Sequence, residues 1–381
     1  MSRSSAVPGR VRGAGGFLTI DLDAVAANYR TLGTRLGPAC ECGAVVKADA
    51  YGLGLAPVAR TLWDAGCRRF FVALTEEGIA LRFLLPEARI YVFDGVDQDT
   101  TADTAAHRLI PVLSHPGQIE TWATYARTQR TRLPALLQME TGMNRLGLST
   151  GEAETLVSDA ADIGALELDG AMSHLACADE PEHPQNAQQL DNFRNALAIL
   201  SPLGLAAASL ANSSGIFLDP AFHFDLARPG AALWGINPQP AGPNPMGQVV
   251  KLQGKILQTR TIDTPSAVGY GATHRVRRGA RIATIGIGYA DGFFRSLSNS
   301  ASAFIGGIRV PVVGRVSMDL ITIDVSAVPA EAAQAGDLVD LISPEHPVDD
   351  LAREAGTIGY EVLTALGRRF ERRYLGGGTG S

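Results

Sequence analysis

The sequence predicts an α/β protein: an N-terminal (β/α)8 barrel of the TIM type, followed by a mostly β C-terminal domain. Eight short apolar runs alternate with stretches of helical periodicity from residue 42 onward, and units of this kind are typical of a parallel barrel. Four prolines within residues 237–245 then end the alternation, because such a segment continues neither a helix nor a central strand. Strand-like runs follow the prolines.

The barrel strands are expected in the apolar runs, with helices between them, for example at residues 56–63 and 188–197. A doubly wound open sheet is the alternative, because a sequence does not show whether a parallel sheet closes. The eight runs are residues 42–49, 69–74, 89–95, 109–114, 134–140, 167–174, 206–211 and 226–234.

Beyond the prolines we expect a domain built mainly of strands, with no long helical pattern before about residue 349. An earlier run, Phe17 to Leu22, is a candidate to pair with this domain. The predicted domains are therefore a barrel at residues 15–240, of which 15–22 pair with the β-domain, and the β-domain at 246–376. The expected strands of the β-domain are residues 249–262, 281–287, 302–313, 320–325 and 337–342.

Composition excludes several classes of function. The 381 residues are 46% hydrophobic, enough for two buried cores, and the net charge of −6 gives no basic surface for nucleic acid. No apolar stretch suits a signal peptide, near Met1 to Ser5 or later, or a membrane span, so we expect a cytoplasmic protein. The cysteines lack the paired spacing of a structural zinc site, so we expect reduced thiols and no metal.

Lysine is rare in this chain: only Lys47, Lys251 and Lys255 are lysines among the 33 basic residues. Lys47 closes the first apolar run. Arginine keeps its proton, whereas a lysine at the end of a buried strand can shift toward neutrality and condense with an aldehyde. A strand-end lysine that simply reaches solvent is the alternative interpretation.

Polar residues follow several predicted strands at their C-terminal ends, where barrel active sites lie. Lys47 ends the first run, Glu140 to Arg145 follow the fifth, and His174 ends the sixth. The hydroxyl and small residues after the seventh run, 212–214, and within the eighth, 228–230, suit a phosphate group. We therefore predict a phosphorylated aldehyde cofactor, although each residue taken singly also suits a structural role.

With further motifs, these residues make the sequence resemble bacterial alanine racemases, which are pyridoxal 5′-phosphate enzymes with a barrel and a β-domain. Each motif is short, but the shared order of the set is highly specific, and the resemblance covers nearly the whole chain. The motifs are Val46–Gly52, Thr141–Gly147, Ala211–Ser213, Arg228–Gly230, Val268–Gly271, Gly288–Gly292, Gly314–Asp319 and Gly356–Glu361.

The resemblance implies an isomerase that interconverts L-alanine and D-alanine on a pyridoxal phosphate aldimine and serves D-alanine biosynthesis. Lys47 would form the Schiff base with the cofactor and act as a base on one face of the substrate, and Tyr270 would act on the other. Two opposed bases suit the inversion of a stereocentre, which loses a proton on one side and gains one on the other.

The resemblance also implies the other contacts of the site. Arg228 would contact the pyridine nitrogen and keep it unprotonated, because a guanidinium offers no acceptor. Arg145 and the backbone amide of Met318 would hold the substrate carboxylate, with Tyr289 and Asp319 beside the substrate. The remaining implied cofactor ligands are Tyr51, His174, Ser213, Gly230, Ala231 and Tyr360.

The predicted β-domain contains four residues assigned to the substrate: Tyr270, Tyr289, Met318 and Asp319. In the family that domain completes the site of the partner subunit, so the resemblance implies a homodimer with shared active sites and a small amino-acid substrate. The family pattern is broken at Gln138, where many relatives carry a carbamylated lysine that orients the carboxylate-binding arginine. Glu140 or a bound anion would then hold Arg145.

Three other functions remain as alternatives. A serine racemase or a racemase of broad specificity is one, because a small pocket rejects one extra polar atom only weakly. A non-catalytic pyridoxal phosphate-binding protein would lack the second domain. A decarboxylase of the related barrel type would carry a cysteine where Ser317 stands and a carboxylate where Arg228 stands.

Overall fold

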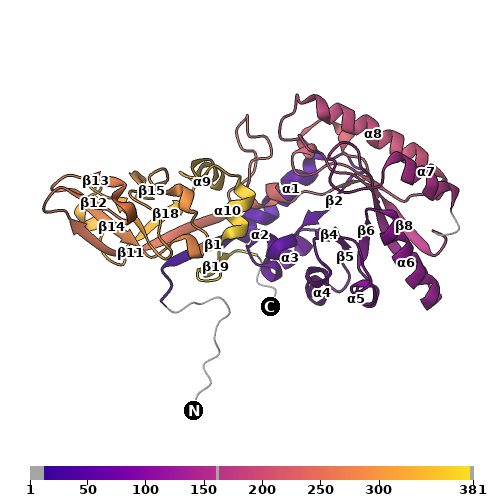
Figure 1. The fold of residues 1–381 in the computed structure, drawn as a ribbon, viewed down its shortest axis with the longest axis horizontal. Coiled ribbons are helices and arrows are strands. Elements are labelled where there is room, and N and C mark those ends of the chain that lie inside the picture. The colour runs from indigo at the N-terminus through magenta and orange to yellow at the C-terminus, as the bar shows by residue number, and fades with distance from the viewer. Residues whose placement is uncertain (1–12, 160–162, 378–381) are drawn as a thin grey trace, which may run out of the picture. The chain divides into compact units, whose positions relative to one another are not determined.

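The computed structural model describes residues 13–159 and 163–377, which form two compact units (Figure 1). Among these residues, the barrel unit contains Val25–Ala50 and Gly54–Gly247; the β-unit contains those up to Ala24, Tyr51–Leu53 and those from Gln248 onward. The prediction that no signal peptide is present concerns the first five residues among others, and these lie outside the described residues. The domain limits at residues 240 and 246 stay predictions.

Seven strands of the barrel unit form one parallel sheet in chain order. An eighth strand, β10 (Leu226–Ala227), pairs in parallel with β2 (Glu41–Cys42). On its other side, Asp225 N donates to Ala208 O at 3.0 Å and Arg228 N donates to Ala211 O at 2.9 Å. Eight strand segments therefore follow one another round the sheet, and the predicted TIM-type fold is confirmed. The seven strands are β3 (Ala44–Val45), β4 (Arg69–Val72), β5 (Arg89–Val92), β6 (Ile110–Leu113), β7 (Leu133–Gln138), β8 (Leu166–Met172) and β9 (Ala208–Ser209).

Helices follow most of these strands and cover the outside of the sheet (Figure 1). Local signals start several of them: Ser149 and Glu152 form a capping box at α7, and a proline stands in the first turn of both α6 and α8. Trp122 of α6 and Phe193 of α8 are fully buried in the core. The helices are α1 (Leu22–Arg35), α3 (Leu55–Asp64), α4 (Thr75–Leu84), α5 (Thr101–Ala106), α6 (Pro116–Gln129), α7 (Thr150–Ser158) and α8 (Pro184–Leu200).

The barrel strands are all shorter than the runs that predicted them, and three differ most. β3 ends at Val45 rather than at residue 49, β9 covers only two residues of the run 206–211, and β10 covers only two of the run 226–234. The rest of the last run includes a 3₁₀ turn at Ala231–Trp234, which is fully buried. Apolar residues remain buried where a strand ends and a turn begins at the barrel rim. Hydrophobicity therefore did not indicate where these three strands end.

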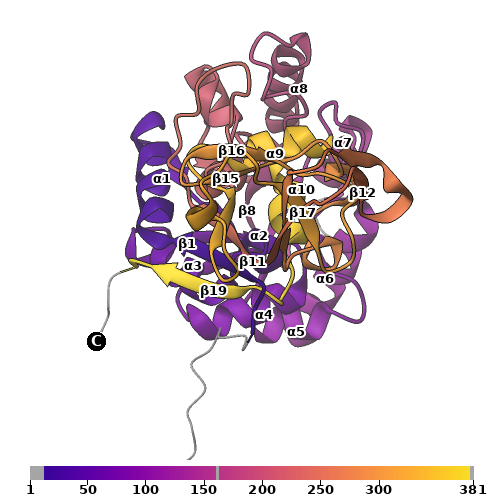
Figure 2. The ribbon, with the colours of Figure 1, turned by 90° about the vertical axis from the view of Figure 1, so that its left-hand side faces the viewer.

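The β-unit is built on one sheet with the strand order β16-β15-β18-β11-β1-β19. β1 (Gly16–Asp21) lies between β11, to which it is antiparallel, and β19, to which it is parallel (Figure 2). β14 and β17 extend the sheet from β11. The bounds are β11 (Val250–Thr261), β14 (Arg281–Ile285), β15 (Ser302–Ile305), β16 (Ile308–Pro311), β17 (Ile321–Asp324), β18 (Leu338–Ile342) and β19 (Glu371–Leu375).

The stretch 302–313, expected as a strand, is a hairpin of β15 and β16. Gly306 and Gly307 form its turn with φ of 55° and 81°, a conformation that suits a tight hairpin and favours glycine. The hairpin of β12 (Ser266–Val268) and β13 (His274–Val276) was not predicted, nor was β19. Helices α9 (Val348–Ala355) and α10 (Gly359–Ala365) begin where the first long helical pattern was expected.

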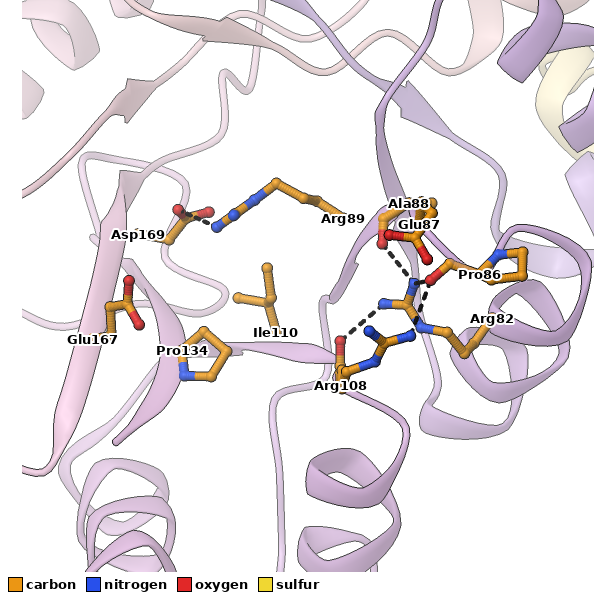
Figure 3. Close-up of a pocket in the computed structure, with 10 residues that line it drawn as sticks. All are labelled: Arg82, Pro86, Glu87, Ala88, Arg89, Arg108, Ile110, Pro134, Glu167 and Asp169. Carbon is orange, nitrogen blue, oxygen red and sulfur yellow. Dashed lines mark hydrogen bonds and ion pairs between the residues drawn. The ribbon is translucent and has the colours of Figure 1, made fainter. Parts of the chain in front are cut away.

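A pocket lies at the N-terminal ends of the barrel strands and is lined by charged side chains (Figure 3). Two of its arginines are held in place: Arg89 pairs with Asp169 at 2.5 Å, and Arg82 donates to the carbonyl oxygens of Pro86 and Ala88 at 2.8 and 2.7 Å. This end of a barrel usually serves stability rather than catalysis. In the described part of the chain, no helix is both long enough and apolar enough to cross a membrane.

Candidate active site

Lys47 begins a short segment whose backbone winds the opposite way from an ordinary helix. Residues 48–51 have φ between 53° and 57°, in the left-handed region that costs roughly 1–2 kcal/mol per residue outside glycine. Several hydrogen bonds hold this turn. Ala48 N donates to Glu77 Oε1 at 2.6 Å, Ala50 N to Val46 O at 3.0 Å, and Leu55 N to Asp49 Oδ1 at 2.7 Å. The turn therefore ends strand β3 and starts from the lysine.

The side chain of Lys47 is partly buried, and its Nζ lies 5.7 Å from the centroid of the Phe93 ring. Desolvation lowers the pKa of this amine, as does the positive charge of Arg145, while the carboxylates of Glu77 and Asp94 act in the opposite direction. A lysine with a lowered pKa has more of the neutral amine that attacks a carbonyl carbon. Lys47 therefore has the environment of a reactive amine.

The loop after β7 carries Arg145, and the side chains of Gln138 and Glu140 hold its backbone. The Glu140 carboxylate accepts hydrogen bonds from Gly142 N and, at 3.4 Å, from Arg145 N. Gln138 Nε2 donates to Leu146 O at 3.1 Å. No ion pair joins the exposed Arg145 guanidinium to another described residue, so this group is available for an anion.

Arg228 is buried, with 3% of its surface exposed. Its guanidinium donates to Ser209 Oγ and, at 2.5 Å, to Ser173 O, and no carboxylate within residues 13–159 or 163–377 pairs with it. Burial lowers the pKa of Arg228 to about 9, which leaves the group protonated at neutral pH. A buried cation without a carboxylate still has N–H donors to offer to a bound group.

His174 stands at the end of β8. Desolvation lowers the pKa of its imidazole to about 3, with further contributions from the positive charges of Arg228, Arg145 and Lys47. The ring is therefore neutral at physiological pH. Because these cations act on His174, and Arg145 acts on Lys47, these four side chains lie near one another at the barrel rim.

Ser213 and the residues after β10 form a cluster of buried donors. Ser213 Oγ accepts from Gly230 N at 3.0 Å and from Ala232 N at 3.2 Å. Since the hydroxyl oxygen takes two N–H donors, its own proton can be donated to another group. Such a donor cluster fits a phosphate, and the amine of Lys47 fits an aldehyde, so the barrel residues fit a phosphorylated aldehyde cofactor.

The predicted residues of the β-unit are mostly exposed: Tyr270 by 73%, Met318 by 54% and Tyr289 by 42%. Tyr289 N donates to Ser317 O at 3.0 Å and Ala290 N to Met318 O at 2.9 Å, so these two loops lie together. The N–H group of Met318 has no partner among the described residues. The rings of Tyr51 and Tyr360 lie in the same unit, with centroids 6.3 Å apart.

Asp319, predicted beside the substrate, has its carboxylate engaged by Arg369 at 2.8 Å. Arg369 also binds Asp291 at 2.6 Å, and Asp291 Oδ2 accepts from Gly288 N at 2.9 Å. Arg369 thus joins the Tyr289 and Met318 loops, a role that sequence analysis missed. It also missed Glu77, for which a glutamate in the first turn of a predicted helix was the only available signal.

Family models match both units. Residues 20–238 match the model described as "Alanine racemase, N-terminal domain", and residues 249–374 match "Alanine racemase, C-terminal domain". The chain belongs to the alanine racemase family. A protein of Rhodospirillum rubrum named alanine racemase is 51% identical over 366 residues, which are 96% of this chain and 97% of that protein. A catabolic alanine racemase of Mesorhizobium japonicum is 48% identical and covers 96% of this chain and 94% of its own.

Solved structures of the family have the same fold. The alanine racemase of Bartonella henselae, crystallised with covalently bound pyridoxal phosphate, is 40% identical with a TM-score of 0.90, covering 95% of this chain and all of its own. The biosynthetic alanine racemase of Pseudomonas aeruginosa is 35% identical with a TM-score of 0.87 over the same shares.

Proposed function

We propose that this protein is a pyridoxal phosphate-dependent alanine racemase, an isomerase that interconverts L-alanine and D-alanine. The observation that carries the proposal is the environment of Lys47, an amine of lowered pKa that shares one barrel rim with Arg145, His174 and Arg228. Relatives named alanine racemase that align over nearly their full length support the same activity.

The cofactor, when bound, supplies an electron sink that makes the Cα–H bond of an amino acid acidic. Lys47 would hold its aldehyde carbon, His174 its ring and Arg228 its pyridine nitrogen. The phosphate ligands proposed are Tyr51, Ser213, Gly230, Ala231 and Tyr360. The Ser213 hydroxyl supports this assignment, because it accepts two amide N–H groups and keeps its own proton for a phosphate oxygen.

The proposal assigns substrate binding to the carboxylate of the amino acid, and proton transfer at its Cα to two side chains. The exposed Arg145 guanidinium, which has no ion-pair partner in the described chain, offers the planar donor fork that a carboxylate fits, and the Met318 amide is a second donor. Lys47 would move a proton to or from Cα on one face and the Tyr270 hydroxyl on the other. Tyr289 and Asp319 are proposed beside the substrate, Asp319 while paired with Arg369.

A homodimer with shared active sites is part of the proposal. Tyr270 and Met318, both assigned to substrate chemistry, are among the most exposed large side chains of the β-unit, and Ile358 is 60% exposed as well. Exposed apolar groups of this kind gather at protein interfaces. We also propose a cytoplasmic location, which is supported by four free cysteines.

Proton exchange tests the two-base assignment. Single enantiomers of alanine are incubated with the holoenzyme in deuterated water, and exchange at Cα is followed by NMR. Tyr270→Phe should slow exchange from one enantiomer by a factor of about 10²–10⁴ and from the other much less, whereas Tyr125→Phe, on α6, should change neither. Equal losses with both enantiomers would contradict the assignment. If the wild-type protein forms no D-alanine from L-alanine, the proposed racemase activity is wrong. The same assay with serine in place of alanine shows whether the enzyme accepts a broader range of amino acids.

A further inference from the structure

Gln189 of α8 is fully buried, with none of its surface exposed. A buried amide must satisfy both its oxygen and its nitrogen, because an unpaired polar group costs roughly 1–3 kcal/mol. Gln189 Oε1 accepts from Ala176 N at 2.8 Å. Its Nε2 donates to His174 O at 2.8 Å and to Thr141 Oγ1 at 3.2 Å. One side chain thus holds the loop after β8 and the loop after β7.

The hydrogen bonds beyond Gln189 have a defined direction. Ser173 Oγ donates its single proton to Met139 O at 2.8 Å. In the Thr141–Ser173 pair, whose hydroxyl oxygens lie 2.7 Å apart, Thr141 must then be the donor. A chain therefore runs from Gln189 through Thr141 and Ser173 to Met139, and aligned donors of this kind strengthen one another.

This chain reaches the side chains of the site. Thr141 belongs to the loop that carries Arg145, and Ser173 precedes His174. The carbonyl oxygen of Ser173 accepts the hydrogen bond of the buried Arg228 guanidinium at 2.5 Å. The groups assigned to the substrate carboxylate, the cofactor ring and the pyridine nitrogen are therefore all tied to one amide.

Two further amides of α8 support Gln189 from the same helical face. Gln185 Nε2 donates to Gly142 O at 2.8 Å, and Asn192 Nδ2 donates to Thr141 O at 2.9 Å. The three positions are spaced four and three residues apart, so they share one face of the helix. A side chain at Gly142 would collide with Gln185, since a Cβ there would lie 2.6 Å from Nε2.

The loop that these amides hold needs outside support. Asn144 has a φ of 54°, and Gly142 and Gly147 have φ of 136° and 128°. The glycines adopt these angles freely, but a residue with a Cβ such as Asn144 persists there only where the surrounding structure holds it.

We propose that the amide face of α8, formed by Gln185, Gln189 and Asn192, is a positioning element of the active site, with Gln189 at its centre. It sets the separation between Arg145, which binds the substrate carboxylate, and the His174 and Arg228 groups, which hold the cofactor ring. This inference rests on the proposed function. A displacement of about 1 Å between such groups can reduce catalysis about 10²-fold.

The test compares two variants of Gln189 in the holoenzyme. Gln189→Glu keeps an oxygen for Ala176 N but loses both N–H donors, and Gln189→Met keeps the length and loses every hydrogen bond. The matched control is Asn195→Asp, an amide-to-acid change at an exposed position of the same helix. Four quantities are measured: KM and kcat for each enantiomer of alanine, the absorbance band of bound pyridoxal phosphate, and the dissociation constant of propionate.

Propionate reports on Arg145 without any racemisation, because it presents the carboxylate of alanine and no amine. We expect both Gln189 variants to weaken propionate binding and to raise KM for both enantiomers about tenfold, with the absorbance band displaced, while Asn195→Asp matches the wild type. Asn192→Ala removes the bond to Thr141 O and an exposed bond from Gln188 Nε2, and leaves every bond of Gln189 in place. It should give a smaller change of the same kind and serves if the Gln189 variants do not fold.

Unchanged propionate affinity and KM in folded variants would overturn the proposal, even if their melting temperature falls, because Gln189 would then be purely structural. If the wild type does not racemise alanine, the proposed function fails. The propionate and absorbance measurements would still decide whether the amide face positions the Arg145 loop and the ring-side groups.

Discussion

Arg228 donates a hydrogen bond to the backbone carbonyl of Ser173 at 2.5 Å, inside the barrel and away from any carboxylate among the described residues. A second donor of Arg228 is held by Ser209 Oγ. The guanidinium is thereby fixed in place as a donor and offers no acceptor. A pyridine nitrogen beside it would stay unprotonated, and the cofactor would be a weaker electron sink.

Replacing Arg228 with glutamate should therefore increase side reactions. A carboxylate can share a proton with the ring nitrogen, so a carbanion would be stabilised longer and protonated more often away from Cα. We expect Arg228→Glu to raise pyruvate formation per racemisation event at least about tenfold, measured with a coupled lactate dehydrogenase assay. Arg194→Glu, at an exposed position of α8, is the control, and an unchanged ratio of pyruvate to racemised alanine would count against this role.

Glu140 should matter for substrate binding through the backbone of the Arg145 loop. Its two carboxylate oxygens accept from Gly142 N and Arg145 N, and a glutamine has only one oxygen to offer. Glu140→Gln should raise KM for both enantiomers several-fold with little change in cofactor absorbance. Glu154→Gln, an exposed change on α7, is the comparison. A variant with wild-type KM would show that the loop does not depend on this carboxylate.

The lowered pKa of His174 predicts how the apoprotein responds to acid. The folded imidazole titrates at about 3 and an unfolded one near 6.5, so the unfolded state binds more protons between these values. Stability should therefore fall as the pH drops below 6.5, by about 2 kcal/mol between pH 7 and pH 5 for this group alone. Urea unfolding of wild type and His174→Gln at both pH values measures the difference, and parallel losses in the two proteins would refute it.

Asp169 should contribute to stability and not to catalysis. Its carboxylate accepts from the Tyr91 hydroxyl and pairs with Arg89 at 2.5 Å and Arg69 at 3.3 Å, at the opposite end of the barrel from Lys47. Asp169→Asn should lower the free energy of unfolding by about 2–3 kcal/mol, less than for a fully buried pair because Arg89 is half-exposed. Asp191→Asn on α8 should be nearly neutral. A large rise in KM for alanine in Asp169→Asn would contradict the assignment.

Strands β4 to β8 and the helices between them followed from hydrophobic periodicity, because buried strands and amphipathic helices impose a local repeat on the chain. The placement of Lys47, His174 and Arg228 at one rim also followed, since parallel strands of a barrel present their C-terminal ends on the same side. The left-handed turn after Lys47 did not follow from the sequence, because residues 48–51 contain no glycine to indicate a positive φ. The engagement of Asp319 by Arg369 was also missed, because those residues are 50 positions apart.

The sequence by itself determined the fold class, the reactive lysine and the family motifs, since each of these is written in neighbouring residues or in a repeated local pattern. Only the tertiary structure decided which groups hold the site in shape. Gln189, Thr141 and Ser173 come from a helix and two loops, and nothing in the sequence around them shows that they bond to one another. Their hydrogen bonds exist because closure of the barrel brings these elements to within 3.2 Å of one another and buries their polar atoms together.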